Sequence, residues 1–134
     1  MSKIIKNSTY DLMKNALDAV NLRQSVLTNN ISNVNTPNFK ASRVKFEETL
    51  KDTIGQGNVS LKGERNNHIS TSTLEDIKGK VIVDKNIKVK EDGNSVDIEK
   101  EMMDMAANQI LYNALVQQVN KKLSNISYVI TGGR

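Results

Sequence analysis

The residues that could carry out chemistry are few, and their spacing fits neither an enzyme nor a metal site. The 134-residue chain has no cysteine, which excludes a disulfide, a thiolate nucleophile and a cysteine-based metal site. His68 is the only histidine and lies in a polar stretch, where we expect it to be solvated rather than catalytic or zinc-binding. There is no Walker-type loop and no glycine-rich dinucleotide fingerprint. We therefore predict no enzyme activity, no cofactor and no small-molecule substrate.

Residues 92–97, Asp-Gly-Asn-Ser-Val-Asp, have some features of a calcium-binding loop. When Gly93 is aligned with the glycine of such a loop, however, Lys88 and Lys90 occupy the first two ligand positions. A lysine cannot serve as a calcium ligand. We interpret this stretch as a turn before a helix, with Asn94 or Ser95 capping the first turn.

A second polar stretch, residues 29–40, is rich in asparagine and contains the only proline of the chain. Asparagine is a poor helix former because its amide competes for backbone groups. Pro37 has no N–H to donate and disfavours the helical conformation at Thr36. The stretch is therefore interpreted either as a frayed helix end followed by a turn, or as a set of amides that bind neighbouring chains.

Two long helices are predicted around these stretches. The first runs from Ser8 or Thr9 to Val34, and the second from Asp97 to Ile130, with no proline or glycine inside either. In both, apolar residues recur at intervals of four and three, as in a coiled coil. These positions are Met13, Leu17, Val20, Leu27, Ile31 and Val34 in the first helix, and Ile98, Met102, Met105, Tyr112, Val116, Val119, Leu123, Ile126 and Ile130 in the second.

We expect the two helices to pair antiparallel, as one domain, with the middle segment projecting from the far end. Each apolar seam is interrupted once, by Gln24 in the first helix and by Gln109 in the second. A buried amide is costly unless it is hydrogen-bonded, and a polar pair at matching layers specifies register. Placing Gln24 opposite Gln109 brings Ile31 beside Met102. The alternative is that each glutamine faces water or another subunit.

The second helix has more apolar surface than one partner helix can cover. Outside the seam it carries Met103, Ala107, Ile110, Leu111, Ala114 and Leu115. A helix that is apolar on most of its circumference must be buried on most of it. Because aromatic residues make up only 4% of the chain and tryptophan is absent, we do not expect a large globular core. Most partners of this helix should belong to other chains.

The middle segment, residues 41–91, has a different composition. Residues 44–50 are predicted to form a short helical or extended piece, in which Phe46 and Leu50 pack on one side of a local turn. Residues 55–72 are polar and rich in Gly, Asn and Ser, which favours a loop. Two short strands, residues 81–84 and 87–90, are predicted to form a hairpin through residues 85–86. The chain thus divides into residues 1–40, 41–91 and 92–134.

The net charge of +4 is spread along the chain, as on an ordinary solvated surface, so it does not favour nucleic-acid binding. No apolar run is long enough for a transmembrane segment. The first six residues contain no apolar core of the length found in a cleavable signal peptide. We expect a protein that stays in the cytosol or leaves it by a route that does not read such a peptide.

Residues 29–40 resemble the N-terminal signature of bacterial flagellar axial proteins, the family that forms rod and hook. Residues 92–115 look like the C-terminal pattern of proximal rod proteins of the basal body. Where the signature has a glycine this chain has Asn38, which tolerates the left-handed conformation. The match is carried by Asn29, Asn30, Asn33, Asn35, Thr36, Pro37 and Phe39 in the first motif, and by Asp92, Gly93, Asn94, Val96, Asp97, Glu101, Gln109 and Tyr112 in the second. Two motifs at opposite ends, in the right order, make the resemblance specific.

The resemblance implies a structural subunit of the flagellar basal-body rod, in the proximal part of the drive shaft that transmits torque from the motor to hook and filament. It also implies export through the flagellar type III apparatus without a cleaved signal peptide. Implied partners are other copies, other rod proteins, the inner-membrane ring with its adaptor, and the export apparatus. Proteins of this family engage the export gate through a phenylalanine followed four residues later by an apolar residue. Phe46 and Leu50 are the pair that fits, with simple packing as the alternative.

A second hypothesis, from a different class, is a cytosolic helical-hairpin adaptor or a nucleic-acid-binding module. Its only support is the positive charge and the absence of a signal peptide. Such a protein would bind nucleic acid in a salt-sensitive way, whereas a rod subunit would sediment with basal bodies after nuclease treatment.

Overall fold

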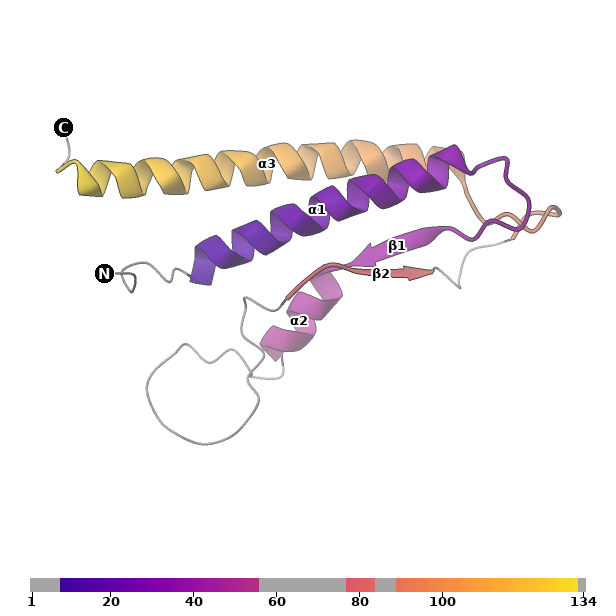
Figure 1. The fold of residues 1–134 in the computed structure, drawn as a ribbon, viewed down its shortest axis with the longest axis horizontal. Helices are drawn as coiled ribbons and strands as arrows, with labels where there is room; N and C mark the ends of the chain where they lie inside the picture. Colours follow the sequence, from indigo (N-terminus) through magenta and orange to yellow (C-terminus); the bar gives the residue numbers. More distant parts are fainter. Residues whose placement is uncertain (1–7, 56–76, 84–88, 133–134) are drawn as a thin grey trace.

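The protein is an elongated, mainly helical molecule (Figure 1), described here from a computed structural model that covers residues 8–55, 77–83 and 89–132. In chain order its elements are α1 (Ser8–Ser32), β1 (Ser42–Lys45), α2 (Glu47–Gly55), β2 (Lys80–Val83) and α3 (Ile98–Ile130). The predicted mainly-α fold with long helices at both ends is confirmed. Helix α1 ends two residues before the predicted Val34, where the asparagine-rich turn begins.

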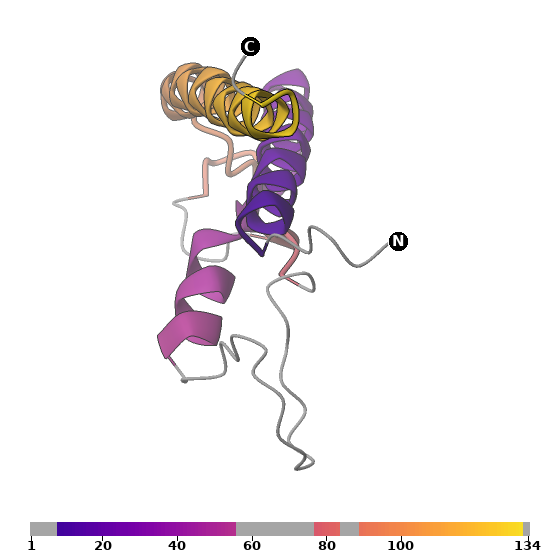
Figure 2. The same cartoon turned by 90° about the vertical axis from the view of Figure 1, so that its left-hand side faces the viewer.

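Helices α1 and α3 form an antiparallel hairpin. They lie closest where α1 ends and α3 begins, and α1 slopes away from α3 toward the chain ends in both views (Figures 1 and 2). The Asn30 side chain donates a hydrogen bond to Glu101 at 3.0 Å, and the Asn108 side chain donates one to Gln24 at 2.9 Å. The register predicted from Gln24 and Gln109 therefore holds to within one residue.

The middle segment does not project from the far end of the hairpin as predicted. Instead it folds back beneath α1, so that β1 lies along that helix and α2 continues below it, pointing away (Figure 1). This happens because the middle segment carries apolar residues that need cover. Phe46 packs against Ala19 of α1, together with Ile77. The hairpin and its middle segment thus share one small core.

The short sheet is also paired differently from the prediction. A strand forms at Lys80–Val83, close to the predicted residues 81–84, but its partner is β1. The two strands are antiparallel, with Ser42 opposite Val83 and Lys45 opposite Lys80. Of the second predicted strand, residues 87–90, only the last two are described and they lie outside any strand. Pairing with β1 buries Val44, which a local hairpin would leave uncovered.

Residues 42–55 form a strand followed by a helix, so both conformations predicted for residues 44–50, extended and helical, occur in this region. Phe46 O accepts a hydrogen bond from Leu50 N at 2.8 Å, and both side chains pack against the core, as predicted for a local turn. Leu12 and Ala16 of α1 complete this cluster. His68 and most of the loop predicted for residues 55–72 lie outside the described residues.

Candidate functional site

The two motifs meet at one end of the helical hairpin, where α1 ends and α3 begins (Figure 1). Two backbone hydrogen bonds of 3.0 Å join them, from Asn38 N to Asp92 O and from Ser95 N to Phe39 O. A third bond, 2.8 Å long, runs from Ala41 N to Ser95 Oγ. Segments that are 54 positions apart in the sequence therefore form one hydrogen-bonded unit.

Asn94 is the centre of this unit and is fully buried. Its Nδ2 donates to three backbone carbonyls, at 2.8 Å to Asn33, 3.2 Å to Val34 and 2.7 Å to Thr36. Its Oδ1 accepts a bond from Val96 N at 2.7 Å. The last carbonyls of a helix have no partner within the helix, and here one amide satisfies those of the turn that ends α1. Asn94 thus fixes the angle at which the chain leaves α1.

Asp92 and Gly93 form the turn that directs Asn94 toward those carbonyls. Asp92 Oδ1 accepts a bond from Asn94 N at 3.0 Å, a typical Asx turn. Gly93 has a φ of 78°, and a Cβ there would lie 2.3 Å from Asn38 Oδ1. Asn38 has a φ of 61°, so it adopts the left-handed conformation expected for the position of the family glycine. The positive φ at both positions explains why glycine occupies position 93 and asparagine position 38.

The N-cap of α3 is Asp97, not Asn94 or Ser95 as predicted. Asp97 Oδ1 accepts bonds from Glu99 N at 3.1 Å and Lys100 N at 3.3 Å. All three residue types are good caps. The prediction failed because the side chains of Asn94 and Ser95 are already committed to the turn that follows α1, which leaves Asp97 to begin the helix.

Beside this unit lies a buried ion pair that connects α1, β1 and α3. Glu101 has no exposed surface, and its carboxylate accepts bonds from Arg43 at 2.7 and 2.5 Å and from Asn30 Nδ2 at 3.0 Å. Asn30 is also fully buried and exchanges two bonds with the backbone of Ser42, at 2.9 and 3.0 Å. A bidentate arginine with a further amide donor gives a buried carboxylate the partners it requires.

Sequence reasoning identified Asn30 and Glu101 as motif residues but missed Arg43 and Ser42. It also placed Met102 on the inner face of α3, whereas Met102 is 60% exposed and Glu101 takes the inner position. An apolar pattern cannot reveal an inner position that is held by a paired charge. The available signal was the acid at 101 within the predicted helix interface, which requires a cation nearby.

The remaining residues of the axial signature lie around the outside of this hairpin end. Asn33 Nδ2 donates to the Asn29 backbone oxygen at 2.8 Å, and Asn33 Oδ1 accepts a bond from Thr36 Oγ1 at 3.2 Å. Asn29, Asn35 and Thr36 are exposed. The turn predicted here is confirmed, and Pro37 lies within it, also exposed. Contact of the exposed amides with neighbouring chains stays a prediction.

Gln109 does not pair with Gln24, which corrects the predicted glutamine pair. It is exposed and donates a weak bond of 3.4 Å to Asn113 on its own helix. Asn108, one residue earlier, faces α1 instead and donates to Gln24 Oε1 at 2.9 Å and Val20 O at 3.1 Å. Tyr112 is half-buried on the same side of α3. An amide pair thus marks the register as predicted, but it belongs to a different residue of α3.

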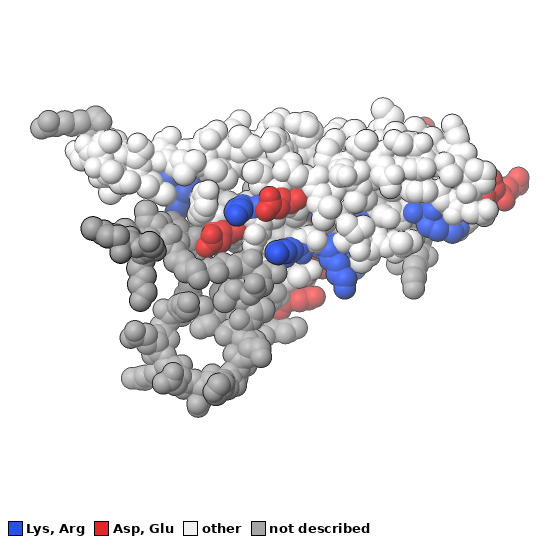
Figure 3. All heavy atoms as spheres, viewed as in Figure 1, with Lys and Arg blue, Asp and Glu red and all other residues white. Residues whose placement is uncertain are grey.

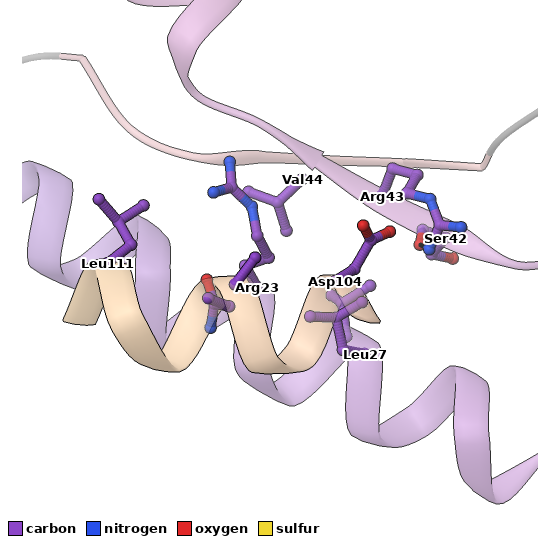
Figure 4. Close-up of a pocket in the computed structure, with 10 residues that line it drawn as sticks. Arg23, Leu27, Ser42, Arg43, Val44, Asp104 and Leu111 are labelled. Carbon is purple, nitrogen blue, oxygen red and sulfur yellow. Dashed lines mark hydrogen bonds between the residues drawn. The ribbon is translucent and has the colours of Figure 1, made fainter. Parts of the chain in front are cut away.

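A cavity of about 280 Å³ opens next to Asn108, between α1, α3 and β1. Figure 4 shows Arg23 and Asp104 rising from the two helices toward β1, which carries Arg43 and Val44. Asn108 is 4% exposed, and within the described part of the chain its Oδ1 has no hydrogen-bond partner. The cavity is lined by the apolar residues Val26, Leu27, Val44, Ala107 and Leu111, and by the polar residues Arg23, Ser42, Arg43, Asp104 and Asn108.

An ion pair beside the cavity ties α1 to α2. Arg23 donates to both carboxylate oxygens of Glu47, at 2.7 and 2.6 Å. Partial burial alone raises the pKa of the Glu47 carboxyl. The bond from Arg23, local backbone bonds and the guanidinium charge together outweigh that effect and hold the pKa below its ordinary 4.5. Because the Glu47 side chain is 62% exposed, solvent screens much of this attraction.

The outer surface of α3 is largely uncharged and apolar. In the view of Figure 3 the lysine, arginine and acidic side chains lie mostly below the upper edge, along which α3 runs. No charged residue occurs between Met105 and Asn120. Met103 and Ile110 are 69% and 71% exposed. A monomer seldom exposes so many large apolar side chains on one element, which indicates a surface that other proteins cover.

Neither a metal site nor a membrane span was found in residues 8–55, 77–83 and 89–132. No group of three or more His, Cys, Asp or Glu residues is placed there to hold a metal ion. Of the helices in this part of the chain, none has the length and hydropathy needed to cross a bilayer. The site is thus a structural junction with an adjacent cavity and an uncovered helix face.

Comparison with known proteins gives consistent matches. The family model described as "Flagella basal body rod protein" matches residues 14–40. The chain is 34% identical to the flagellar basal body rod protein FlgB of Bacillus subtilis (strain 168), with 96% of this chain and 97% of the relative covered. It is 37% identical to FlgB of Borrelia hermsii, with 91% and 95% covered. The chain is 29% identical to the FlgB protein of Borreliella burgdorferi, again with 91% of this chain and 95% of the relative covered.

Proposed function

The chain belongs to the family of FlgB-type flagellar basal body rod proteins, and on that premise we propose that it is a structural subunit of the rod. In this role it forms part of the proximal drive shaft, which transmits torque from the motor to hook and filament. The observation that carries the proposal is the joining of both family motifs into one buried unit around Asn94 and Glu101. A subunit with a fixed hairpin end can be stacked in a repeating array.

The physical properties of the hairpin suit a load-bearing part. Close-packed helices resist deformation, and the polar bonds of Asn30, Asn94 and Glu101 hold α1, β1 and α3 at fixed angles. The exposed apolar side chains of α3 provide surface for neighbouring subunits. The role we propose is purely structural, without catalysis. In this role the two helices of the hairpin, within residues 1–40 and 92–134, act as one domain, and the middle segment, residues 41–91, is an accessory segment that shares the small core with α1.

We further propose that the partners are other copies of the chain, other rod proteins, and the inner-membrane ring with its adaptor. Export through the flagellar type III apparatus brings the chain to the basal body without a cleaved signal peptide. If Phe46 and Leu50 are read by the export gate, they must be read before folding, because Phe46 is buried against α1 in the folded chain. Their other role, packing, is visible in the fold.

The proposal is tested by finding where the protein is located in the cell. Basal bodies are purified from a strain in which a tagged chain replaces the chromosomal copy, and are then treated with nuclease and high salt. We expect the tagged chain to remain with the basal bodies and to restore motility to a deletion strain. A chain found only in the cytosol, or released by nuclease or salt, would reject the rod assignment. A tagged cytosolic enzyme serves as the control for contamination.

A further inference from the structure

The side of α3 that points away from α1 is covered by no other described element. In both views α3 forms one side of the molecule, with α1, β1 and α2 on the opposite side (Figures 1 and 2). Ile110, which is 71% exposed, marks the centre of this side. We call outer face the exposed residues that lie within about 40° of it around the helix axis: Met103, Ala106, Ile110, Ala114 and Gln117.

One acidic and one basic residue bracket the outer face at equal distances. Glu99 lies eleven residues before Ile110 and Lys121 eleven residues after it, and both are exposed. Both lie within about 20° of Ile110 around the axis, and within the described part of the chain neither forms an ion pair. The other charged residues of α3 lie about 80° to 180° away from Ile110: Lys100, Glu101, Asp104 and Lys122.

This arrangement is complementary to itself when a second copy is turned around. If two copies place their α3 helices antiparallel, with Ile110 facing Ile110, the Glu99 of each copy lies level with the Lys121 of the other. Such a contact is isologous, so each pairing occurs twice. A parallel pair in register would instead bring Glu99 against Glu99 and Lys121 against Lys121, and like charges repel. The charges therefore favour the antiparallel orientation.

The outer face also has the shape that close helix packing requires. Ala106 and Ala114 are level with each other in the antiparallel pair, and their small side chains allow the helix axes to approach to about 8 Å. Met103, which is 69% exposed, and Ile110 supply the larger apolar contacts. No charged residue lies between Met105 and Asn120, so the middle of the contact buries no charge.

We propose that two copies of the free chain pair antiparallel through the outer face of α3, with Ile110 on the two-fold axis and a Glu99–Lys121 pair at each end. The inference goes beyond the proposed rod subunit. Subunits of an open array repeat by a head-to-tail contact, so a two-fold contact belongs to the chain before assembly. Because pairing covers apolar surface that neighbouring subunits would use, pairing and assembly exclude each other.

Charge reversal tests the ends of the contact. In sedimentation equilibrium of the purified full chain, Glu99→Lys and Lys121→Glu should each raise the Kd for self-association at least about fivefold, since like charges then meet at both ends. The double variant Glu99→Lys with Lys121→Glu restores opposite charges and should return to within about twofold of the wild-type Kd. Lys14→Glu makes the same change of net charge as Lys121→Glu at an exposed position of α1, and should leave the Kd unchanged.

Cysteine crosslinking tests the position of the axis, because the chain has no cysteine of its own. With a short bis-maleimide, Ile110→Cys alone should give a covalent dimer. Gln117→Cys alone should give little, since position 117 of the other copy lies fourteen residues, roughly 21 Å, away along the paired helices. A mixture of Met103→Cys and Gln117→Cys should crosslink, because these positions are level with each other.

A chain that stays monomeric up to about 1 mM would overturn this inference. A dimer whose Kd is not restored by the charge swap would also overturn it. The same holds if Gln117→Cys crosslinks with itself as readily as Ile110→Cys, because that pattern marks a parallel pair. All three results leave the rod assignment intact, since that assignment depends on finding the chain in basal bodies.

Discussion

Replacing Arg43 by methionine should destabilise the fold more than any surface substitution, because it leaves the buried Glu101 carboxylate without its cation. Arg43 donates two of the three bonds that Glu101 accepts from side chains, at 2.7 and 2.5 Å. In the variant only the amide of Asn30 remains. Methionine retains much of the apolar stem of arginine, so the substitution removes mainly the charge and the bonds.

The expected loss follows from the burial of the pair. Glu101 is 0% exposed and the Arg43 side chain is only 19% exposed, so solvent cannot replace the lost partner. Removing one member of a buried ion pair typically costs about 3–5 kcal/mol. With a urea m-value of about 1–3 kcal/mol/M, the unfolding midpoint should fall by about 1 M or more. Because typical domains have about 5–15 kcal/mol of stability, this loss would leave a protein near the lower end of that range only marginally stable.

Urea unfolding of the purified chain, followed by circular dichroism, provides the assay. The double variant Arg43→Met with Glu101→Leu is the informative control, since replacing both members with apolar residues removes the unpaired charge and should recover most of the loss. Arg43→Lys keeps the charge but loses the bidentate geometry and should lie in between. An Arg43→Met variant within about 0.5 kcal/mol of wild type would refute the assignment of the pair as a structural lock.

Other substitutions probe the hairpin end and the conditions under which it is stable. Asn94→Ala should cost about 1–3 kcal/mol by removing the donor to three carbonyls, whereas Asn35→Ala at an exposed position should change the urea midpoint little. Gly93→Ala should lower the melting temperature more than Gly132→Ala. Both glycines have a positive φ, but only at position 93 would a Cβ meet another side chain. Thermal melts of the two variants measure the difference. The Glu47 pair stabilises the fold above pH 4.5, and this contribution is lost as the pH falls through the lowered pKa, so the stability difference between wild type and Glu47→Gln should shrink in acid. The purified chain should show more amide exchange at the diverging helix ends than the assembled rod, and equal protection in both states would contradict this.

The sequence was sufficient to predict both long helices because their apolar residues recur at helical spacing without an internal proline or glycine. The register was also predictable, since one amide on each helix marks the matching layer. Which of the two adjacent amides, Asn108 or Gln109, faces α1 was not predictable, because they differ only in the face of the helix on which they lie. For the same reason the inner position of α3 was assigned to Met102 instead of Glu101, because a pattern of apolar residues favours methionine.

The folding of the middle segment could not be predicted from local patterns. The strand at Lys80–Val83 is visible in its β-branched residues, but its partner at Ser42–Lys45 is far away in the sequence. Local reasoning pairs neighbouring strands, whereas burial of Val44 and Phe46 against α1 decides the actual pairing. The central role of Asn94 was hidden in the same way, because its three acceptors belong to the turn that follows α1, 58 to 61 positions earlier in the sequence.

A side-chain-resolution map of purified basal bodies, obtained by electron cryomicroscopy, tests the central claim most directly. We predict density in the proximal rod that fits the α1–α3 hairpin, with Asn94 enclosed by the turn after α1 and Glu101 paired with Arg43. A rod in which no subunit fits this sequence, or in which the two helices of this chain lie apart without the junction of the two motifs, would contradict the account.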